Sequence, residues 1–464
     1  MLSALDYSLI LLYFIVIIGV GCFSMKLAKS KEDFLVAGRR LSFPMFFGCM
    51  TALALGGGST VGSVKLGYLF GFGGVWLNVS IGIGLILTGL LVSSKLSKLK
   101  ALSINDVVEA SYGSYARIFS SLLTFIYTIT LSIVQVIAIG TIIGGTFGIS
   151  SVLSMVIGGG IVILYTFIGG MWSVTLTDII QFVIKTLGIL ILAPVFSIHA
   201  VGGWDKFIIS IPASHLTITS MGFHGSFLYI ILYVPGLIIG QDIWQRIFTA
   251  QNDRIASTGT ILAGCYSILY AFATAIIGMS VFILLPNLDD PQTAFVSGVI
   301  SFLPAGIKGI VLAAAVAATM SVSSGTILAS STILYNDLYQ RFINRNPDEK
   351  KAIWVTRGFA VSIGIIVMIC ALWIRDVLVG IDICYGYLSG CVFVPVLASF
   401  VLKRYSSKSG VYSLAASSII VTVLFIKYGT SSIFPILYGM LAGLVVYIAV
   451  NLISKEKVDS QFGK

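Results

Sequence analysis

The sequence predicts an all-α protein that crosses a membrane about thirteen times. Two features of composition indicate this fold class: 57% of the 464 residues are hydrophobic, and only 10% are charged. Soluble domains carry about 25% charged residues. Apolar runs of about 20 residues, enough to span a bilayer as a helix, also recur along the whole chain. The longest loops, expected at 201–223 and 286–305, are too short for a soluble domain, so we expect one transmembrane domain over residues 1–464.

The expected spans follow from apolar windows of membrane length, read in order from the N-terminus. A helix satisfies its own backbone hydrogen bonds, which the lipid cannot do, so each window is expected to be helical. The spans are expected at 5–25, 44–63, 74–95, 117–145, 151–169, 175–200, 224–243, 258–285, 306–338, 351–375, 377–402, 409–428 and 431–453.

The basic residues fall into two sets of loops on opposite sides of these spans. One set contains Lys26, Lys29, Lys31, Arg39, Arg40, Lys95, Lys98, Lys100, Arg246, Arg254, Arg341, Arg345, Lys350, Lys351, Lys403, Arg404, Lys408, Lys455, Lys457 and Lys464. The opposite set contains only Lys65, Lys206, Lys308, Arg375 and Lys427. Because loops rich in lysine and arginine stay in the cytoplasm, we expect a multi-pass protein of the plasma or inner membrane, with its N-terminus outside and its C-terminus in the cytoplasm. Topology thus explains the net charge of +10, and no nucleic-acid partner is expected.

Residues 51–65, TALALGGGSTVGSVK, interrupt the second expected span. The glycines from Gly56 to Gly58 lower the helix propensity at one point, and Ser59 and Thr60 place hydroxyls where a lipid-facing helix would carry leucine. Two interpretations are open. The segment could pack closely against another helix, or it could be a broken helix whose free carbonyls and amides face a cavity. The concentration of glycines and polar side chains favours the broken helix.

A second interruption is expected at 231–247, ILYVPGLIIGQDIWQRI, in the seventh span. Pro235 and Gly236 are expected to break the helix, and the polar residues Gln241 and Asp242 follow on otherwise apolar sequence. The two breaks lie five spans apart. This is the offset that a five-plus-five inverted repeat requires, and transporters of that design commonly carry one broken helix in each repeat.

An acidic residue, Asp178, is expected near the start of the sixth span, within GGMWSVTLTDIIQFVIK at 169–185. Asp178 and Gln181 share one helix face at i, i+3. The carboxylate could lie at the membrane interface, but intramembrane acids usually face cavities, which favours a buried ligand for a cation or proton. Lys185 lies two turns beyond Asp178, too far for an easy contact, and we assign it no role.

Small and hydroxyl residues form a stripe at helical spacing in the ninth span, within residues 309–339. Such a stripe could serve tight helix packing. Alternatively, its hydroxyls could join the free carbonyls of a neighbouring broken helix around a sodium ion. The stripe consists of Ala317, Ala318, Ser321, Ser324 and Gly325.

These segments together resemble the solute:sodium symporter family over nearly the whole chain. The resemblance rests on the order and spacing of EDFLVAGRRL, TALALGGGSTVG, VTLTDIIQ, GQDIWQRIFTAQND, YNDLY and FVLKRYSSKSG. It implies a LeuT-like fold that works by alternating access around a site at the membrane midplane. The two core repeats would cover about 44–200 and 224–402, with peripheral helices at about 5–25, 409–428 and 431–453.

The resemblance also implies a sodium site but no organic cofactor. The implied ligands are the backbone carbonyls of Gly57, Thr60 and Ala318 and the hydroxyl of Ser321. Some family members hold a further cation, which would here lie near Asp178 with Ser321 and Ser324 as partners. This chain departs from the family pattern at one position. The family usually carries a second hydroxyl directly after the serine that corresponds to Ser321, and here that residue is Val322.

The substrate is expected between the two broken helices. The expected contacts are Ser59, Thr60, Ser63, Gln135, Gln241, Tyr385 and Tyr387. The two tyrosines could instead be interfacial or packing residues. Lys65 could meet an anionic substrate or could reach the outer surface.

The sequence thus predicts a secondary active transporter that imports a small polar organic solute, of amino-acid, carboxylate, sugar or vitamin type, with sodium. Because of Val322, a proton-coupled or sodium-independent carrier of the same fold is the alternative, and a substrate-gated channel or membrane sensor is the alternative of another class. An enzyme is not expected, since the three histidines, at 199, 215 and 224, lack metal-ligand spacing. The six cysteines lie in apolar segments without CxxC spacing and are expected to pack. No protein partner is indicated.

Overall fold

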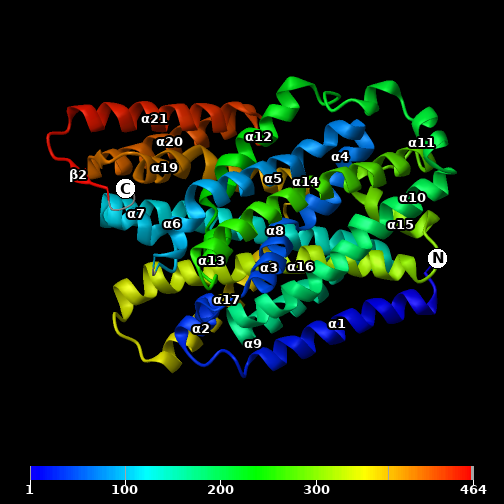
Figure 1. Ribbon diagram of the computed structural model, residues 1–464, viewed down its shortest axis with the longest axis horizontal. Helices are drawn as coiled ribbons and strands as arrows, with labels where there is room; N and C mark the ends of the chain where they lie inside the picture. The colour runs from blue at the N-terminus through cyan, green and yellow to red at the C-terminus, as the bar shows by residue number, and fades with distance from the viewer. Residues whose placement is uncertain (1, 100, 375, 461–464) are drawn as a thin grey trace.

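The computed structural model describes residues 2–99, 101–374 and 376–460, so Lys100, Arg375 and Lys464 of the two basic sets lie outside the described residues. The protein is an elongated bundle whose helices run mostly along its long axis, with the two termini at opposite ends (Figure 1). In the described part of the chain, eleven helices are long and apolar enough to cross a membrane. The predicted all-α membrane fold is confirmed.

The elements up to residue 210 are α1 (Ala4–Ser24), α2 (Lys31–Val36), η1 (Ala37–Arg39), α3 (Phe43–Ala54), η2 (Gly58–Gly62), α4 (Ser63–Phe70), η3 (Gly71–Val75), α5 (Trp76–Thr88), η4 (Gly89–Ser93), α6 (Ser94–Ser97), α7 (Ile104–Tyr112), α8 (Ser114–Phe147), α9 (Ser151–Lys185), η5 (Thr186–Leu192), α10 (Ala193–Val201) and α11 (Trp204–Ser210). The later elements are η6 (Ala213–Leu216), α12 (Gly222–Ile239), α13 (Gln241–Ile247), α14 (Asp253–Leu284), η7 (Pro291–Thr293), α15 (Ala294–Phe302), α16 (Ile307–Ile333), η8 (Leu334–Ile343), α17 (Glu349–Ala371), α18 (Val377–Tyr387), η9 (Leu388–Val392), α19 (Phe393–Val401), β1 (Arg404–Tyr405), α20 (Ser407–Tyr428), α21 (Phe434–Ile453) and β2 (Val458–Asp459). The two short strands pair antiparallel with each other.

The eleven long helices correspond to the thirteen predicted spans because two of them hold more than one span. The run Ser151–Val201 contains the fifth and sixth spans, and Gly58–Ser97 contains the third span and the second half of the second. Gly170 marks the turn between the fifth and sixth spans with a φ of +55°. A Cβ at this position would lie 2.6 Å from the backbone oxygen of Phe34, so both the conformation and the space require glycine.

The core of the bundle is built around α16, where 94% of the most apolar window is buried. The same share is 28% for α1 and 22% for α21, which therefore present most of their surface to the surroundings. In Figure 1, α3 and α16 lie close together at the centre of the bundle, and the two elements are in contact. Side chains from several spans can therefore meet at α16.

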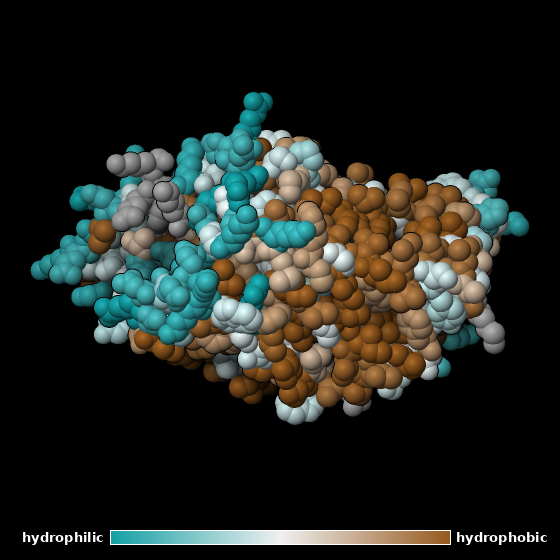
Figure 2. Space-filling model, turned by 90° about the horizontal axis from the view of Figure 1, so that it is seen from below, coloured by the Kyte–Doolittle hydropathy of each residue, from teal (hydrophilic) through white to brown (hydrophobic). Residues whose placement is uncertain are grey.

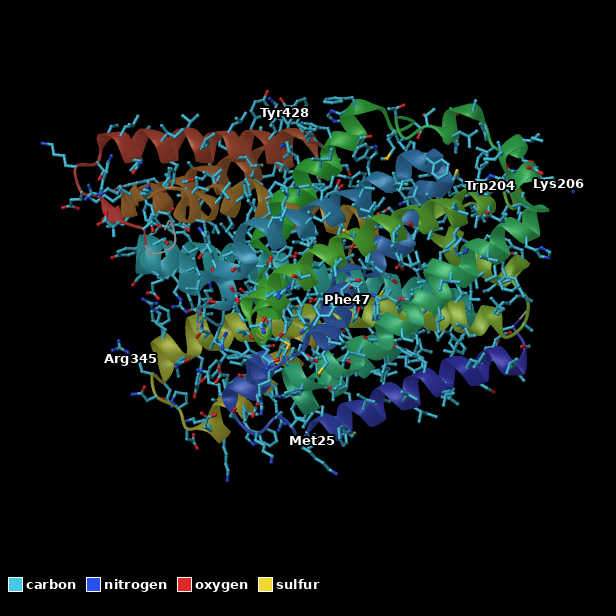
Figure 3. The ribbon with its side chains drawn as sticks, viewed as in Figure 1. Met25, Phe47, Trp204, Lys206, Arg345 and Tyr428 are labelled. Carbon is cyan, nitrogen blue, oxygen red and sulfur yellow. The ribbon has the colours of Figure 1, made fainter. Side chains whose placement is uncertain are left out.

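The surface carries the hydrophobic band that a bilayer requires. Figure 2 shows this band between one broad hydrophilic end and a smaller hydrophilic area at the opposite end. Arg345 lies at the end that holds the C-terminus, whereas Trp204 and Lys206 lie at the other end (Figure 3). The protein is a multi-pass membrane protein, and the predicted basic loops gather mainly at one of its ends.

The first predicted break is present where the sequence places it. Helix α3 ends at Ala54, Leu55 leaves the helical conformation with φ −118° and ψ 82°, and the chain resumes as the π-helical turn η2 at Gly58. The carbonyl groups at the end of α3 therefore have no helical partners in the following turn.

The second break is displaced from the predicted one. Helix α12 continues through Pro235 and ends at Ile239, and Gly240, with φ −64° and ψ 125°, separates it from α13. The prediction that Pro235 and Gly236 break the helix was wrong. A proline removes one backbone donor, which a membrane helix in a packed bundle tolerates, whereas the extended conformation of Gly240 ends the helix outright.

Candidate functional site

A small cavity lies where the two broken helices approach each other. Its volume is about 30 Å³, and it has both apolar and polar walls. The polar side chains among the lining residues are Ser59, Gln135, Tyr233, Asp242 and Tyr385. A cavity of this size holds about one water molecule, so the helices must move apart before an organic solute can enter.

Asp242 is the charged residue of this cavity. It follows Gly240 at the start of α13, and its Oδ1 accepts a hydrogen bond from the Tyr127 hydroxyl at 2.9 Å. The Tyr385 ring packs against Tyr233 and Tyr127, with ring centroids 4.5 and 5.3 Å apart. The second break thus places a carboxylate beside a cluster of aromatic rings, which is a suitable environment for a cationic or hydrogen-donating group.

Three of the predicted substrate residues line this cavity: Ser59, Gln135 and Tyr385. The Gln135 side chain has a second contact, because its Oε1 accepts a hydrogen bond from the Gly57 backbone N–H at 2.6 Å. This bond satisfies an amide that the interruption of the helix leaves free. Gln135 therefore both lines the cavity and holds the first break in place.

The other four predicted substrate residues lie elsewhere. The Thr60 hydroxyl is 2.7 Å from the Tyr270 hydroxyl, and the buried Ser63 hydroxyl has no hydrogen-bond partner among the described residues. Gln241 accepts a hydrogen bond from the Ile104 N–H at 2.7 Å and so contacts the chain before α7. Tyr387 lies 3.0 Å from Thr422 of α20, on the peripheral side of α18. Tyr233 and Asp242 were not predicted as substrate residues.

The residues implied for sodium are only partly brought together. The Ser321 hydroxyl lies 2.8 Å from the carbonyl oxygen of Ala52 and 3.1 Å from that of Ala318. Its partner on the first broken helix is therefore Ala52, rather than Gly57 or Thr60. The Ser324 hydroxyl donates to the carbonyl of Ser321 within its own helix, at 3.0 Å.

Asp178 forms an ion pair that the sequence did not indicate. Its Oδ2 lies 2.8 Å from an Arg246 nitrogen, and the two side chains are 0% and 2% exposed. The Cys49 thiol also lies 3.2 Å from this carboxylate. Arg246 was predicted in a cytoplasmic loop, and this was wrong: it lies on α13, inside the bundle, where Asp178 compensates its charge.

Lys185 is buried at the end of α9 and contacts the first break directly. Its Nζ donates hydrogen bonds to the carbonyl oxygens of Ala52 at 2.7 Å and Leu55 at 3.0 Å. These carbonyls belong to the C-terminal end of α3, where the partial charge of a helix is negative. The lysine thus has a definite structural partner, although the spacing in the sequence assigned it none.

Ionic contacts close both ends of the bundle around the cavity. At the end that holds the C-terminus, Arg117 of α8 pairs with Asp106 at 2.8 Å, with Glu109 at 2.5 Å and with Asp337. At the opposite end, Lys65 of α4 pairs with Asp376 at 2.8 Å, next to the start of α18. The cavity therefore lies between two sets of ionic contacts, one toward each end of the bundle.

The three glycines of the first break differ in how closely other helices approach them. We expect Gly57→Ala to lower the stability of the protein by about 1–3 kcal/mol, as overpacking does. A Cβ on Gly57 would lie 2.4 Å from Ala138 Cβ and 2.8 Å from Thr319 Cγ2, and the Ala138 Cβ cannot move without its helix.

Gly58→Ala is the matched control. A Cβ there would meet the end of the flexible Ile381 side chain, which a rotamer change can relieve. Thermal unfolding of the purified variants, followed by size-exclusion chromatography, should show a lower midpoint for Gly57→Ala alone. Equal midpoints for the two variants would contradict the packing described for Gly57.

A central cavity between two broken helices is typical of secondary transporters. The Sodium:solute symporter family model matches residues 34–417. The chain belongs to this family, whose members couple the transport of small organic solutes to sodium.

Similar proteins agree with the family assignment. The Sodium/proline symporter of Escherichia coli (strain K12) is 24% identical, over 94% of this chain and 90% of its own. The Sodium/glucose cotransporter of Vibrio parahaemolyticus is 24% identical, over 100% of this chain and 93% of its own. High-affinity choline transporter 1 of Caenorhabditis elegans is 24% identical, over 89% of this chain and 76% of its own.

Solved structures confirm the fold. The substrate-bound outward-open state of a Na+-coupled sialic acid symporter matches with a TM-score of 0.85 and 20% sequence identity, over 98% of this chain and 99% of the other. MhsT in complex with L-phenylalanine matches with a TM-score of 0.53 and 13% identity, over 87% of this chain and 98% of the other. The LeuT-like architecture implied by the sequence resemblance is therefore confirmed.

Proposed function

We propose that this chain is a secondary active transporter that imports a small polar organic solute by alternating access, with the solute bound between the two broken helices. The observation that carries the proposal is the cavity at which both breaks meet. Ser59, Gln135 and Tyr385, together with Asp242 and Tyr233, are the residues that would contact the solute once the cavity widens. The ionic contacts at the two ends would act as the two gates.

The cavity favours a solute that carries an amine. Asp242 supplies a carboxylate that bonds to the Tyr127 hydroxyl, and the Tyr385 ring packs between those of Tyr127 and Tyr233. A cationic amine can bind both to a carboxylate and to aromatic faces. Among amino acids, carboxylates, sugars and vitamins, amino acids and other amines are therefore the first solutes to examine.

A reconstituted uptake assay tests the proposal. Purified protein in proteoliposomes should accumulate at least one labelled solute from a panel of proline, choline, glucose and small carboxylates, under an inward sodium or proton gradient. Asp242→Asn should weaken the apparent affinity for an amine more than for a neutral sugar. Uptake equal to that of protein-free vesicles for every solute, under both gradients, would refute the transport proposal.

The proposed orientation in the cell membrane, with the N-terminus outside and the C-terminus in the cytoplasm, rests on the positive-inside rule. Single cysteines placed at Lys98, Arg345 and Lys403 should react with an impermeant thiol reagent only from the cytoplasmic side. A cysteine at Lys206 should react only from outside, and it serves as the matched control. Labelling of Arg345→Cys from outside in intact cells would overturn the orientation.

Sodium is the coupling ion of the family, and the first break is where the implied sodium ligands lie. Sodium is a hard cation and prefers oxygen ligands, as calcium and magnesium do. The carbonyls of Ala52 and Ala318 and the hydroxyl of Ser321 lie together and would supply three. The nitrogen of Lys185, however, binds the same Ala52 oxygen. The residues present therefore do not fit a free sodium ion at this position.

A further inference from the structure

We propose that the Lys185 side chain is a tethered cation that takes the place of a free sodium ion at the C-terminal end of α3. The position binds an ammonium group that belongs to the protein and cannot cross the membrane with the solute. The inference rests on the proposed function, since solute uptake is one of its assays. It goes beyond that proposal because it predicts that uptake does not depend on sodium.

The geometry of the broken helix is the first argument. Helix α3 ends at Ala54, and its last carbonyls face the interior of the protein instead of the next helical turn. Buried carbonyls need a hydrogen-bond donor or a cation. Lys185 Nζ donates hydrogen bonds to the carbonyl oxygens of Ala52 and Leu55, at 2.7 and 3.0 Å. The lysine side chain is fully buried. An ammonium has only donors, so a set of carbonyl oxygens is a complementary environment for it.

The oxygen shared with Ser321 is the second argument. The Ala52 carbonyl lies 2.7 Å from Lys185 Nζ and 2.8 Å from the Ser321 hydroxyl. Through this one atom, the ammonium contacts the group formed by the Ala52 and Ala318 carbonyls and the Ser321 hydroxyl, and the family resemblance implies Ala318 and Ser321 as sodium ligands. A sodium ion bound to Ala52 and Leu55 would have to occupy the volume of the ammonium. A sodium ion and an ammonium group so close together in a protein interior would repel each other strongly.

The side chains around this position supply the third argument. Val322 follows Ser321 and adds no oxygen, and its Cγ2 methyl group lies against Gly56. The nearest acid, Asp178, already pairs with Arg246 at 2.8 Å. Among the described residues, the hydrogen-bond partners of Lys185 Nζ are therefore the Ala52 and Leu55 carbonyls and no carboxylate. The Cys49 thiol, which lies 3.2 Å from the Asp178 carboxylate, is neutral.

The expected consequence is that uptake by the wild-type protein does not respond to sodium. The rate should be unchanged when potassium replaces sodium on both sides of the proteoliposome membrane. Radioactive sodium should not bind to the purified wild-type protein at this position.

The double variant Lys185→Ala/Val322→Ser tests the position. It removes the ammonium and adds a hydroxyl beside Ser321, so sodium binding and sodium stimulation of solute uptake should appear. The matched control, Lys185→Arg/Val322→Ser, keeps a cationic side chain and should gain neither. Val322→Ser alone, with Lys185 in place, should also gain neither.

Two results would overturn the inference. One is solute uptake by the wild-type protein that requires sodium and is lost when potassium replaces it. The other is sodium stimulation in Val322→Ser alone, which would show that lysine and sodium share the site; this readout remains if Lys185→Ala fails to fold. Absence of uptake for all solutes would refute the transport proposal, and sodium binding by the purified protein would still decide the role of Lys185.

Discussion

Replacing either Asp178 or Arg246 alone is expected to destabilise the protein by about 3–5 kcal/mol, because each change leaves the opposite charge buried without a partner. The side chains are 0% and 2% exposed, so water cannot compensate the remaining charge. Asp178→Asn and Arg246→Met should each lower the thermal unfolding midpoint of the purified protein. Both should also reduce solute uptake, since the pair joins α9 to α13 next to the second break.

The double variant Asp178→Leu/Arg246→Met separates the cost of an unpaired charge from the value of the pair itself. Apolar replacement of both partners of a buried pair is often neutral for stability. We therefore expect the double variant to be more stable than either single variant. Lys98→Met, which removes one partner of an exposed pair with Asp253, is the control and should change little. Additive losses in the double variant would contradict this account of the pair.

Replacing Arg117 is expected to weaken the closure at one end of the bundle far more than replacing Lys65 weakens the other. Arg117→Met leaves Asp337, with a fully buried side chain, without its guanidinium partner, a loss of about 3–5 kcal/mol. The side chains of Lys65 and Asp376 are 15% and 41% exposed, and pairs in contact with water contribute about 0–1 kcal/mol.

The reactivity of a cysteine that replaces Ser59, which lines the cavity, measures how far each replacement opens the cavity to water. In inside-out vesicles, Arg117→Met should increase the labelling of Ser59→Cys by an impermeant thiol reagent several-fold. In right-side-out vesicles, Lys65→Met should increase it only slightly. Equal increases for the two variants would contradict the assignment of the stronger gate to Arg117.

Hydropathy predicted the spans because an apolar segment that crosses a bilayer is restricted to helical structure. Each segment in lipid must satisfy its own hydrogen bonds, so length and apolar composition nearly determine a membrane helix. The first break was also predictable, since three consecutive glycines lower helix propensity at one point of an apolar run. The second was misplaced because Pro235 is the stronger helix-breaking signal in the sequence, whereas the packed helix α12 tolerates it.

The contacts within the site were less predictable, because their partners are distant in the sequence. Arg246 resembles a loop arginine until Asp178, 68 residues earlier, is placed beside it. Lys185 binds backbone carbonyls, and a pattern of side chains cannot reveal such partners. The break at Gly240 decides where the side chains after it point: Asp242 faces the cavity, whereas Gln241 contacts the chain before α7.

Solute counterflow in proteoliposomes tests whether this chain is a carrier that alternates between two states. Vesicles are loaded with unlabelled solute and diluted into a trace of the same solute in labelled form, with no ion gradient. A carrier that closes around its solute exchanges the two pools, so the labelled solute should accumulate transiently above its equilibrium level, even when sodium is absent. A channel or a sensor produces no such overshoot. Absence of counterflow for a solute that the protein transports, or ion conductance without solute, would contradict the assignment.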